Sequence, residues 1–176
     1  GFGRIGKKIA KYGQAFGMNV ITYTKGSFTS IKNVKHMDSL STLLENSDIV
    51  SIHVPLDSTT KMMFTDEEFN MMKSSSILIN TSRGEIIDEG ALIKAIKCGS
   101  ISGAALDVLE DEVALIRERK SKVIEFSKNE DRIIITPHIG GATIESMEKT
   151  EIFMADKLVN YFETKSSMKY QQGVNK

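Results

Sequence analysis

Short apolar runs recur along the chain and alternate with longer segments in which apolar and polar residues follow a helical period. The runs are rich in Val and Ile and are mostly continuous, a pattern typical of strands that are buried on both faces of a parallel sheet. They occupy residues 19–23, 48–54, 76–80, 101–108 and 132–136. The pattern therefore predicts five buried strands separated by helices.

Helix signals lie between these runs. Thr65 and Glu68 have the spacing of a capping box, and Asp88 can cap a helix that ends at Gly99. A longer segment, residues 143–163, is amphipathic, and we expect its stripe to pack on a neighbouring element. The stripe consists of Ile144, Met147, Glu151, Ala155, Leu158 and Phe162.

The alternation of strand and helix predicts an α/β fold, namely a doubly wound parallel sheet of the Rossmann type with right-handed crossovers. Such a sheet binds its ligand beyond the carboxyl ends of the strands. Its first strand would precede Gly1, so we expect that strand to be missing from the N-terminus. The charged stretch 113–130 indicates a surface helix or a pair of helical turns.

Length and composition narrow the classes of partner. The 176 residues suffice for one domain with a buried core. The 23 basic residues balance 23 acidic ones, and no apolar run approaches the roughly 18 residues of a membrane span, so we expect neither nucleic acid nor a membrane as partner. Cys98 is the only cysteine, which excludes an intrachain disulfide and fits a cytoplasmic protein. His36, His53 and His138 lack the spacing of a metal site, so we predict no metal.

The segment GFGRIG places Gly1, Gly3 and Gly6 at the spacing of a dinucleotide-binding loop and precedes a predicted helix. The glycines permit a tight turn, and the helix N-terminus offers free N–H groups to a pyrophosphate. At the end of the next strand, Thr24 stands where NAD-binding proteins usually have an acidic residue. Lys25 follows it and is either a solvated turn residue or a group that attracts a 2′-phosphate. We expect NAD as cofactor, with NADP still open.

Three further strand ends carry polar groups. Arg83 follows the third run, Asp107 lies at the end of the fourth and Glu110 follows it, and His138 follows the fifth. A guanidinium beyond a buried strand suits a carboxylate ligand, although a lone Arg is better explained by a structural ion pair. A lone His at a strand end can likewise have a structural role.

Taken in order, the segments GFGRIG, HVPLDSTT, INTSRGEIID, GAALDVLEDE and TPHIGGAT resemble the D-isomer-specific 2-hydroxyacid dehydrogenase family, and the HVP form looks closest to its phosphoglycerate dehydrogenase-like members. The resemblance implies a bilobed enzyme whose nucleotide-binding domain is inserted within a substrate domain. We assign residues 1–163 to a dinucleotide-binding domain without its substrate lobe, and residues 164–176 to a polar tail that we expect to be frayed.

The resemblance also implies roles for individual residues. Arg83 should bind the carboxylate and keto oxygen of the substrate, and His138 should be the acid/base. Glu112 should be the acidic partner of that His, with Glu110 as the fallback, because Val113 replaces the proline that usually follows the glutamate. The residues implied to contact the cofactor are Gly1, Gly3, Arg4, Ile5, Gly6, Thr24, His53, Val54, Pro55, Thr81, Ser82, Arg83, Asp107, His138, Gly140 and Gly141.

These residues predict an oxidoreductase that transfers a hydride between NAD(P) and a 2-hydroxy acid or 2-keto acid, and the family implies a homodimer. A dinucleotide-binding regulatory scaffold of the corepressor kind is the alternative, and the isolated chain is expected to be an inactive fragment. The presence of Arg83, Glu112 and His138 together favours the enzyme, because a protein that only binds the dinucleotide has no need of all three.

Overall fold

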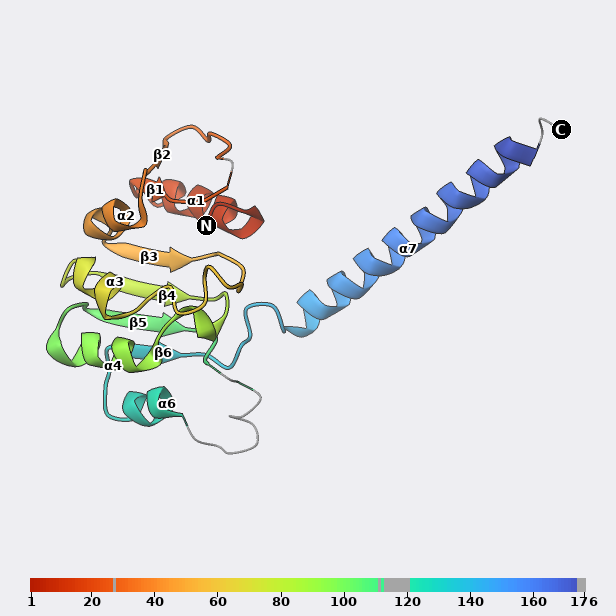
Figure 1. Ribbon diagram of the computed structural model, residues 1–176. Helices are drawn as coiled ribbons and strands as arrows, with labels where there is room; N and C mark the ends of the chain where they lie inside the picture. The colour runs from red at the N-terminus through yellow and green to blue at the C-terminus, as the bar shows by residue number, and fades with distance from the viewer. Residues whose placement is uncertain (27, 111, 113–120, 174–176) are drawn as a thin grey trace. The chain divides into compact units, whose positions relative to one another are not determined.

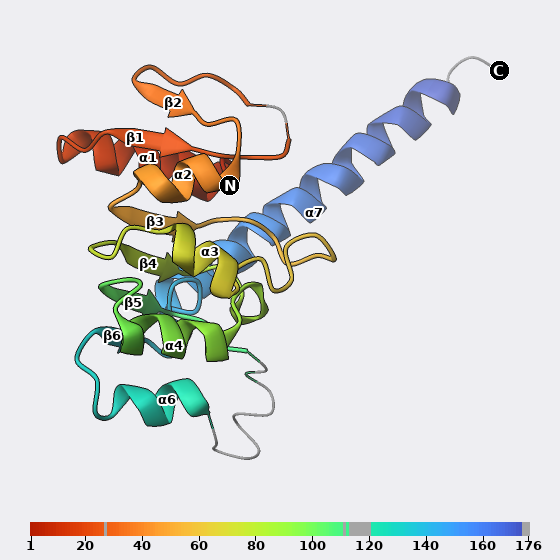
Figure 2. The same cartoon turned by 60° about the vertical axis from the view of Figure 1, so that its left-hand side comes forward.

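A computed structural model describes residues 1–26, 28–110, 112 and 121–173, with side chains as far as Thr164. The chain forms two units, Gly1–Pro137 and His138–Lys176. The first unit alternates strands and helices around parallel sheets, which confirms the predicted α/β class (Figures 1 and 2).

All strand pairs in the first unit are parallel. The six strands are β1 (Val20–Thr22), β2 (Val34–His36), β3 (Ile49–Ile52), β4 (Ile77–Asn80), β5 (Gly103–Leu106) and β6 (Ile133–Ile135). Five of them fall within the predicted apolar runs. The sequence analysis missed β2, because only one of its three residues is buried and its central residue is the exposed Lys35.

The strands form two sheets, one with the order β1-β2 and one with the order β3-β4-β5-β6. Gly1 contacts the end of each sheet: its nitrogen donates to the Tyr23 carbonyl at 3.0 Å, and a Cβ atom on Gly1 would lie 2.4 Å from the His53 carbonyl oxygen. In a doubly wound sheet the first strand runs between the second and the fourth. The glycine loop therefore starts where such a first strand ends.

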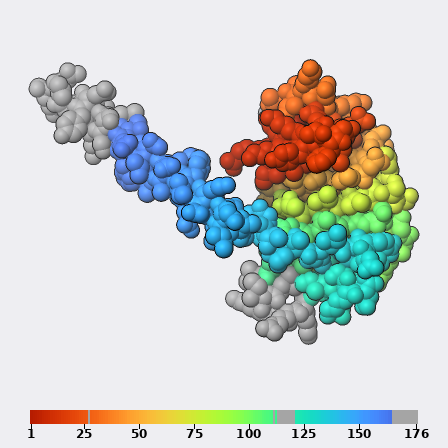
Figure 3. All heavy atoms as spheres, turned by 180° about the vertical axis from the view of Figure 1, so that it is seen from behind, coloured from red at the N-terminus to blue at the C-terminus, as the bar shows by residue number. Residues whose placement is uncertain are grey.

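Helices cover the larger sheet and close its core. They are α2 (Leu40–Asn46), α3 (Asp66–Met71), α4 (Glu89–Cys98) and α6 (Lys122–Ser127), and they follow one another along the sheet (Figures 1 and 2). The fully buried apolar side chains come from both layers and are Leu44, Phe64, Phe69, Leu78, Ile86, Leu92, Ile96, Ile101 and Val123. α6 confirms a helix in the charged stretch, whose residues 113–120 lie outside the described part of the chain. α1 (Arg4–Ala15) lies at the surface of the first unit, in red in Figure 3.

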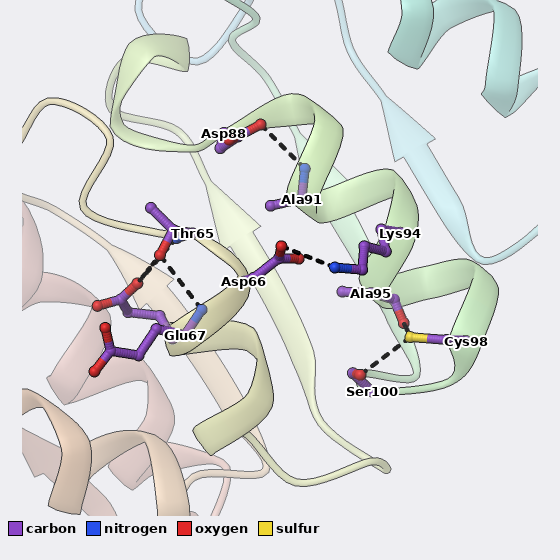
Figure 4. Close-up of polar contacts among 10 residues, drawn as sticks. Thr65, Asp66, Glu67, Asp88, Ala91, Lys94, Ala95, Cys98 and Ser100 are labelled. Carbon is purple, nitrogen blue, oxygen red and sulfur yellow. Dashed lines mark hydrogen bonds and ion pairs between the residues drawn. The ribbon is translucent and has the colours of Figure 1, made fainter.

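The predicted helix ends are confirmed at two helices (Figure 4). The Thr65 amide and hydroxyl donate to the Glu68 carboxylate at 3.0 and 2.7 Å, which forms the predicted capping box of α3. The Asp88 carboxylate accepts from the Ala91 amide at 3.0 Å, and α4 ends at Gly99 with a φ of 75°. A backbone in this left-handed conformation favours glycine, so Gly99 stops the helix where the sequence predicts.

The second unit contains α7 (Ile144–Gly173). Within the described part of this unit no other element covers the predicted stripe, whose Ile144, Leu158 and Phe162 are exposed, and its packing on a neighbouring element stays a prediction. α7 continues past residue 163 as far as Gly173, and no glycine or proline interrupts it before that residue; the fraying of residues 164–176 stays a prediction. Among the described residues, no helix is long and apolar enough to cross a membrane.

Candidate functional site

The glycine loop packs tightly on one side and is open on the other. A Cβ atom on Gly6 would lie 2.3 Å from the Gly1 carbonyl oxygen, so Gly1 and Gly6 allow the loop and the helix to approach each other. Gly3 is the N-cap of α1, has no side chain to cap the helix, and a Cβ atom there would meet nothing within 4 Å. The loop therefore leaves the first amides of α1 accessible on the side of Gly3, and a pyrophosphate fits this arrangement.

A pocket of about 620 Å³ lies beside the loop. Its lining is formed by Gly3, Arg4, Ile5, Lys7, Lys8, Lys11 and His53. The His53 ring is half-buried and its Nε2 lies 2.9 Å from the Ser51 hydroxyl. Burial lowers the pKa of His53. The remaining titratable side chains of the pocket are basic, so the pocket suits an anion.

The segments that follow β3 and β4 are joined by a side-chain hydrogen bond, and a second one holds the segment after β3. The Ser82 hydroxyl donates to the Val54 carbonyl, and the Pro55 carbonyl accepts from the Thr60 hydroxyl at 2.6 Å. Thr81, the neighbour of Ser82, is exposed. The structure thus brings the HVP segment and the TSRG segment together at one edge of the sheet.

Asn80 shapes the turn that carries Arg83, and the sequence analysis missed it. Its side chain is fully buried, donates to the Arg83 carbonyl at 2.9 Å and accepts from the Ser82 amide at 3.0 Å. The Arg83 side chain is exposed, and one guanidinium nitrogen donates to the Ser82 carbonyl at 2.6 Å. A polar amide at the last position of an apolar strand is the signal that could have identified Asn80.

Gly84 packs this turn against the segment after β5. A Cβ atom on Gly84 would lie 1.9 Å from the Leu109 carbonyl carbon and 2.3 Å from the Glu110 nitrogen. Only glycine permits so close a contact between two backbones. The turn with Arg83 and the acidic segment with Glu110 are therefore held together by backbone packing.

Polar residues at the ends of β4, β5 and β6 continue the hydrogen bonding between these neighbouring strands. The Asp107 amide donates to the Asn80 carbonyl at 2.9 Å, and the Thr136 hydroxyl donates to the Asp107 carboxylate at 2.5 Å. Asp107 is buried, with 7% of its surface exposed. The sequence analysis identified Asp107 but missed Thr136, whose contact with Asp107 joins residues 29 positions apart.

Two carboxylates hold the acidic segment itself. The Glu112 carboxylate accepts from the Leu109 amide at 3.2 Å, and the Glu89 carboxylate, at the start of α4, accepts from the Glu110 amide at 2.8 Å. Burial raises the pKa of Glu89, and the hydrogen bond from the Glu110 amide lowers it by less. The negative charges of Glu110 and Asp88 also raise this pKa. The sequence analysis missed Glu89, because its role depends on a segment 21 residues away.

His138 belongs to the second unit and has a left-handed backbone, with a φ of 52°. Its side chain is half-buried. Non-glycine residues rarely adopt this conformation, and they concentrate at functional sites. Gly140 and Gly141 follow it, and a Cβ atom on Gly141 would meet nothing within 4 Å. In the described part of the chain, no three His, Cys, Asp or Glu side chains gather as metal ligands do.

Known proteins match the chain over most of its length. Residues 1–140 match the family model of the D-isomer-specific 2-hydroxyacid dehydrogenase, NAD-binding domain. The chain is 41% identical over 164 residues to glyoxylate reductase of Thermococcus litoralis, which covers 92% of this chain and 47% of that protein. It is 37% identical over 169 residues to D-3-phosphoglycerate dehydrogenase of Escherichia coli, which covers 96% of this chain and 40% of that protein.

The fold matches solved structures as well. The structure of D-lactate dehydrogenase from Aquifex aeolicus, complexed with NAD and lactic acid, has a TM-score of 0.81 and is 35% identical, covering 93% of this chain and 52% of that one. The chain spans about half the length of the curated relatives it matches.

Replacing Gly84 should destabilise the first unit through one contact. In Gly84→Ala the new methyl group meets the Leu109 backbone, which must move, so we expect the free energy of unfolding to fall by about 1–3 kcal/mol. Urea denaturation measures this change. Gly26→Ala is the matched control, because a Cβ atom there meets nothing within 4 Å. Equal stabilities of the two variants would contradict the proposed contact.

Glu89→Gln should have a pH-dependent effect on stability. The pKa of Glu89 is raised in the folded state, so its favourable contribution is present below its unfolded pKa and is lost as the pH rises through its folded pKa. Gln keeps an acceptor for the Glu110 amide but carries no charge. Relative to the wild type, the variant should therefore gain stability between about pH 4 and pH 7. Urea denaturation at both pH values tests this, and a difference that does not change with pH would refute it.

Proposed function

The chain belongs to the D-isomer-specific 2-hydroxyacid dehydrogenase family, as its NAD-binding domain, and we propose that its protein transfers a hydride between a nicotinamide dinucleotide and a D-2-hydroxy acid or the corresponding 2-keto acid. The observation that carries this proposal is the continuous line of contacts from the glycine loop through Ser82 and Asn80 to Asp107. The names of the relatives suggest small 2-keto acids, with glyoxylate and 3-phosphohydroxypyruvate as the first substrates to test. We favour a phosphoglycerate dehydrogenase-like enzyme.

The dinucleotide would lie along this line of contacts. The amides of Arg4 and Ile5 at the start of α1 would hold its pyrophosphate, and Thr24 would bind the adenosine ribose. Thr81 and Asp107 would lie beside the nicotinamide, and the Asp107 carboxylate would bind its carboxamide. When bound, the nicotinamide supplies or accepts the hydride.

Arg83 would orient the substrate. Its guanidinium is exposed at the carboxyl edge of the sheet, and within the described part of the chain it donates only to the neighbouring Ser82 carbonyl, so the side chain can turn toward a ligand. A guanidinium can bind a carboxylate through two parallel hydrogen bonds and stabilise negative charge on the adjacent keto oxygen. These interactions explain an Arg at this place better than a structural ion pair, because no ion pair involving Arg83 is found among the described residues.

His138 would hold the proton that the keto oxygen takes up during reduction. An imidazole titrates near neutral pH, and a carboxylate on its other nitrogen favours the protonated form. Glu112 is the residue we assign to that role. The Glu112 carboxylate accepts a hydrogen bond from the Leu109 amide. The backbone amide of Glu110 donates to Glu89, and the carboxylate of Glu110 is the fallback for the role of acidic partner.

A homodimer formed through this domain completes the proposal. Three apolar side chains of α1, at positions 5, 9 and 12, and that of its C-cap Phe16 lie on one exposed stripe, with exposed fractions of 61% for Tyr12 and 81% for Phe16. The buried residues of α1, Gly6 and Ala10, lie on another side of the helix. An exposed apolar stripe of this kind marks an association surface.

A cytoplasmic location fits the single cysteine and the use of a dinucleotide.

Substitutions at the three catalytic positions should have different effects. In the full-length protein, His138→Ala and Arg83→Ala should each lower kcat/KM by about 100-fold or more, because each removes a group that contacts the reacting oxygen. Glu112→Gln should instead move the alkaline limb of the kcat/KM profile for keto-acid reduction to lower pH, because it lowers the imidazole pKa. Steady-state assays with NADH and both keto acids measure these changes.

The matched control for Glu112 is Glu125→Gln on α6, where the carboxylate forms an exposed ion pair with Lys128. This variant should leave the pH profile unchanged. If Glu112→Gln also left the profile unchanged, the role of acidic partner would pass to Glu110. If His138→Ala retained full activity, the proposed chemistry would be wrong.

The dimer is tested by its dependence on α1. Tyr12→Ser and Phe16→Ser together should raise the dimer dissociation constant by about tenfold or more, because both side chains lose apolar burial at the interface. Analytical ultracentrifugation measures it. Ile134→Ser, at an equally exposed residue on β6, is the control and should not change it. A monomeric wild-type protein would contradict the proposal.

A further inference from the structure

The charges of this protein are unevenly distributed along the chain. The first 37 residues contain seven basic residues and no acidic one, and all 23 acidic residues lie at or after Asp38. The seven basic residues are Arg4, Lys7, Lys8, Lys11, Lys25, Lys32 and Lys35. The segment that builds the glycine loop, α1 and both strands of the smaller sheet is therefore uniformly positive, although the net charge of the protein is zero.

These charges gather where the adenosine half of a dinucleotide would bind. Four of them, Arg4, Lys7, Lys8 and Lys11, line the pocket beside the glycine loop. A fifth, Lys25, is exposed directly after β1, close to the point where the Tyr23 carbonyl accepts a hydrogen bond from Gly1. The end of β1 and the start of the loop are thus neighbours, and no acidic side chain from this segment is present to oppose an anion.

The residue at the end of β1 decides which ribose is accepted. A carboxylate there accepts hydrogen bonds from both ribose hydroxyls and repels a 2′-phosphate. Thr24 is half-buried at this place and can donate to a phosphate oxygen or accept from a hydroxyl. A 2′-phosphate adds about two negative charges, which the neighbouring cations would stabilise.

We infer that Thr24 and Lys25 form a binding site for a 2′-phosphate, so that this protein binds NADP(H) at least as tightly as NAD(H). The inference rests on the proposed function, because it assumes that a dinucleotide binds at the glycine loop. A pyrophosphate alone does not account for the charge, since backbone amides at a helix N-terminus already bind it. The two explanations of the positive charge are a 2′-phosphate and a pyrophosphate alone. Lys25 distinguishes them most directly, because it lies after β1, next to the ribose position at Thr24.

Calorimetric titration of the full-length protein tests the inference without measuring turnover. NADP should bind with a Kd equal to or lower than that of NAD, and adenosine 2′,5′-bisphosphate should bind about fivefold or more tightly than adenosine 5′-monophosphate. The second comparison isolates the 2′-phosphate from the nicotinamide. Raising the salt concentration should weaken NADP binding more than NAD binding, because salt screens the additional charge.

Two variants and one control assign the effect to the end of β1. Thr24→Asp should weaken NADP binding by about tenfold or more, since it places a carboxylate beside the phosphate. Lys25→Gln should weaken NADP binding by about fivefold and leave NAD binding within about twofold. The control is Lys32→Gln, because Lys32 precedes β2 at the amino edge of the sheet. Its carbonyl accepts from Gln14 near the end of α1, a helix of 12 residues or about 18 Å that starts at the loop.

The outcomes separate this inference from the proposed function. If NAD bound more tightly than NADP, this inference would fail while the proposed function stood. An equal loss of NADP binding in Lys25→Gln and Lys32→Gln would also overturn it, because a general positive field would then explain the result. If neither dinucleotide bound, both proposals would fail.

Discussion

The buried amide of Asn80 organises the edge of the sheet on which the proposed site depends. It lies at the last position of β4 and makes one hydrogen bond to each of two backbone groups in the turn that carries Arg83. The backbone carbonyl of Asn80 accepts a hydrogen bond from the Asp107 amide and so continues the pairing of β4 with β5. The Asp107 carboxylate in turn accepts from the Thr136 hydroxyl. Because a fully buried amide is costly unless it is satisfied, these bonds define one conformation of the turn. The side chain of Arg83 can then remain exposed and available to a ligand.

Close backbone contacts complete this edge. Gly6 packs on Gly1, Gly1 packs on His53, and Gly84 packs on Leu109, each at distances that a side chain would prevent. These contacts bring segments from β3, β4 and β5 together without using polar side chains. Gly3 differs because nothing approaches it, which leaves the first amides of α1 accessible. The same residue type therefore serves packing at some positions and ligand access at another.

The sequence predicts those features that depend on local patterns. The buried strands follow from continuous apolar runs, and the ends of α3 and α4 follow from Thr65, Asp88 and Gly99. The contacts of Asn80, Glu89 and Thr136 could not be predicted in this way, because each joins segments that meet only after folding. The partner of α7 could not be predicted, since an amphipathic stripe shows that a partner is needed but does not identify one. The positive charge of the first 37 residues could not be seen in the net charge, because the acidic residues at and after Asp38 balance it.

The central claim is that the carboxyl edge of the sheet binds a dinucleotide and a 2-keto acid together. A crystal structure of the full-length protein with NADH and oxamate, an unreactive analogue of a 2-keto acid, tests it most directly. The account predicts the pyrophosphate on the amides of Arg4 and Ile5, and the oxamate carboxylate on the guanidinium of Arg83. A dinucleotide bound away from the glycine loop, or an oxamate that does not contact Arg83, would contradict it.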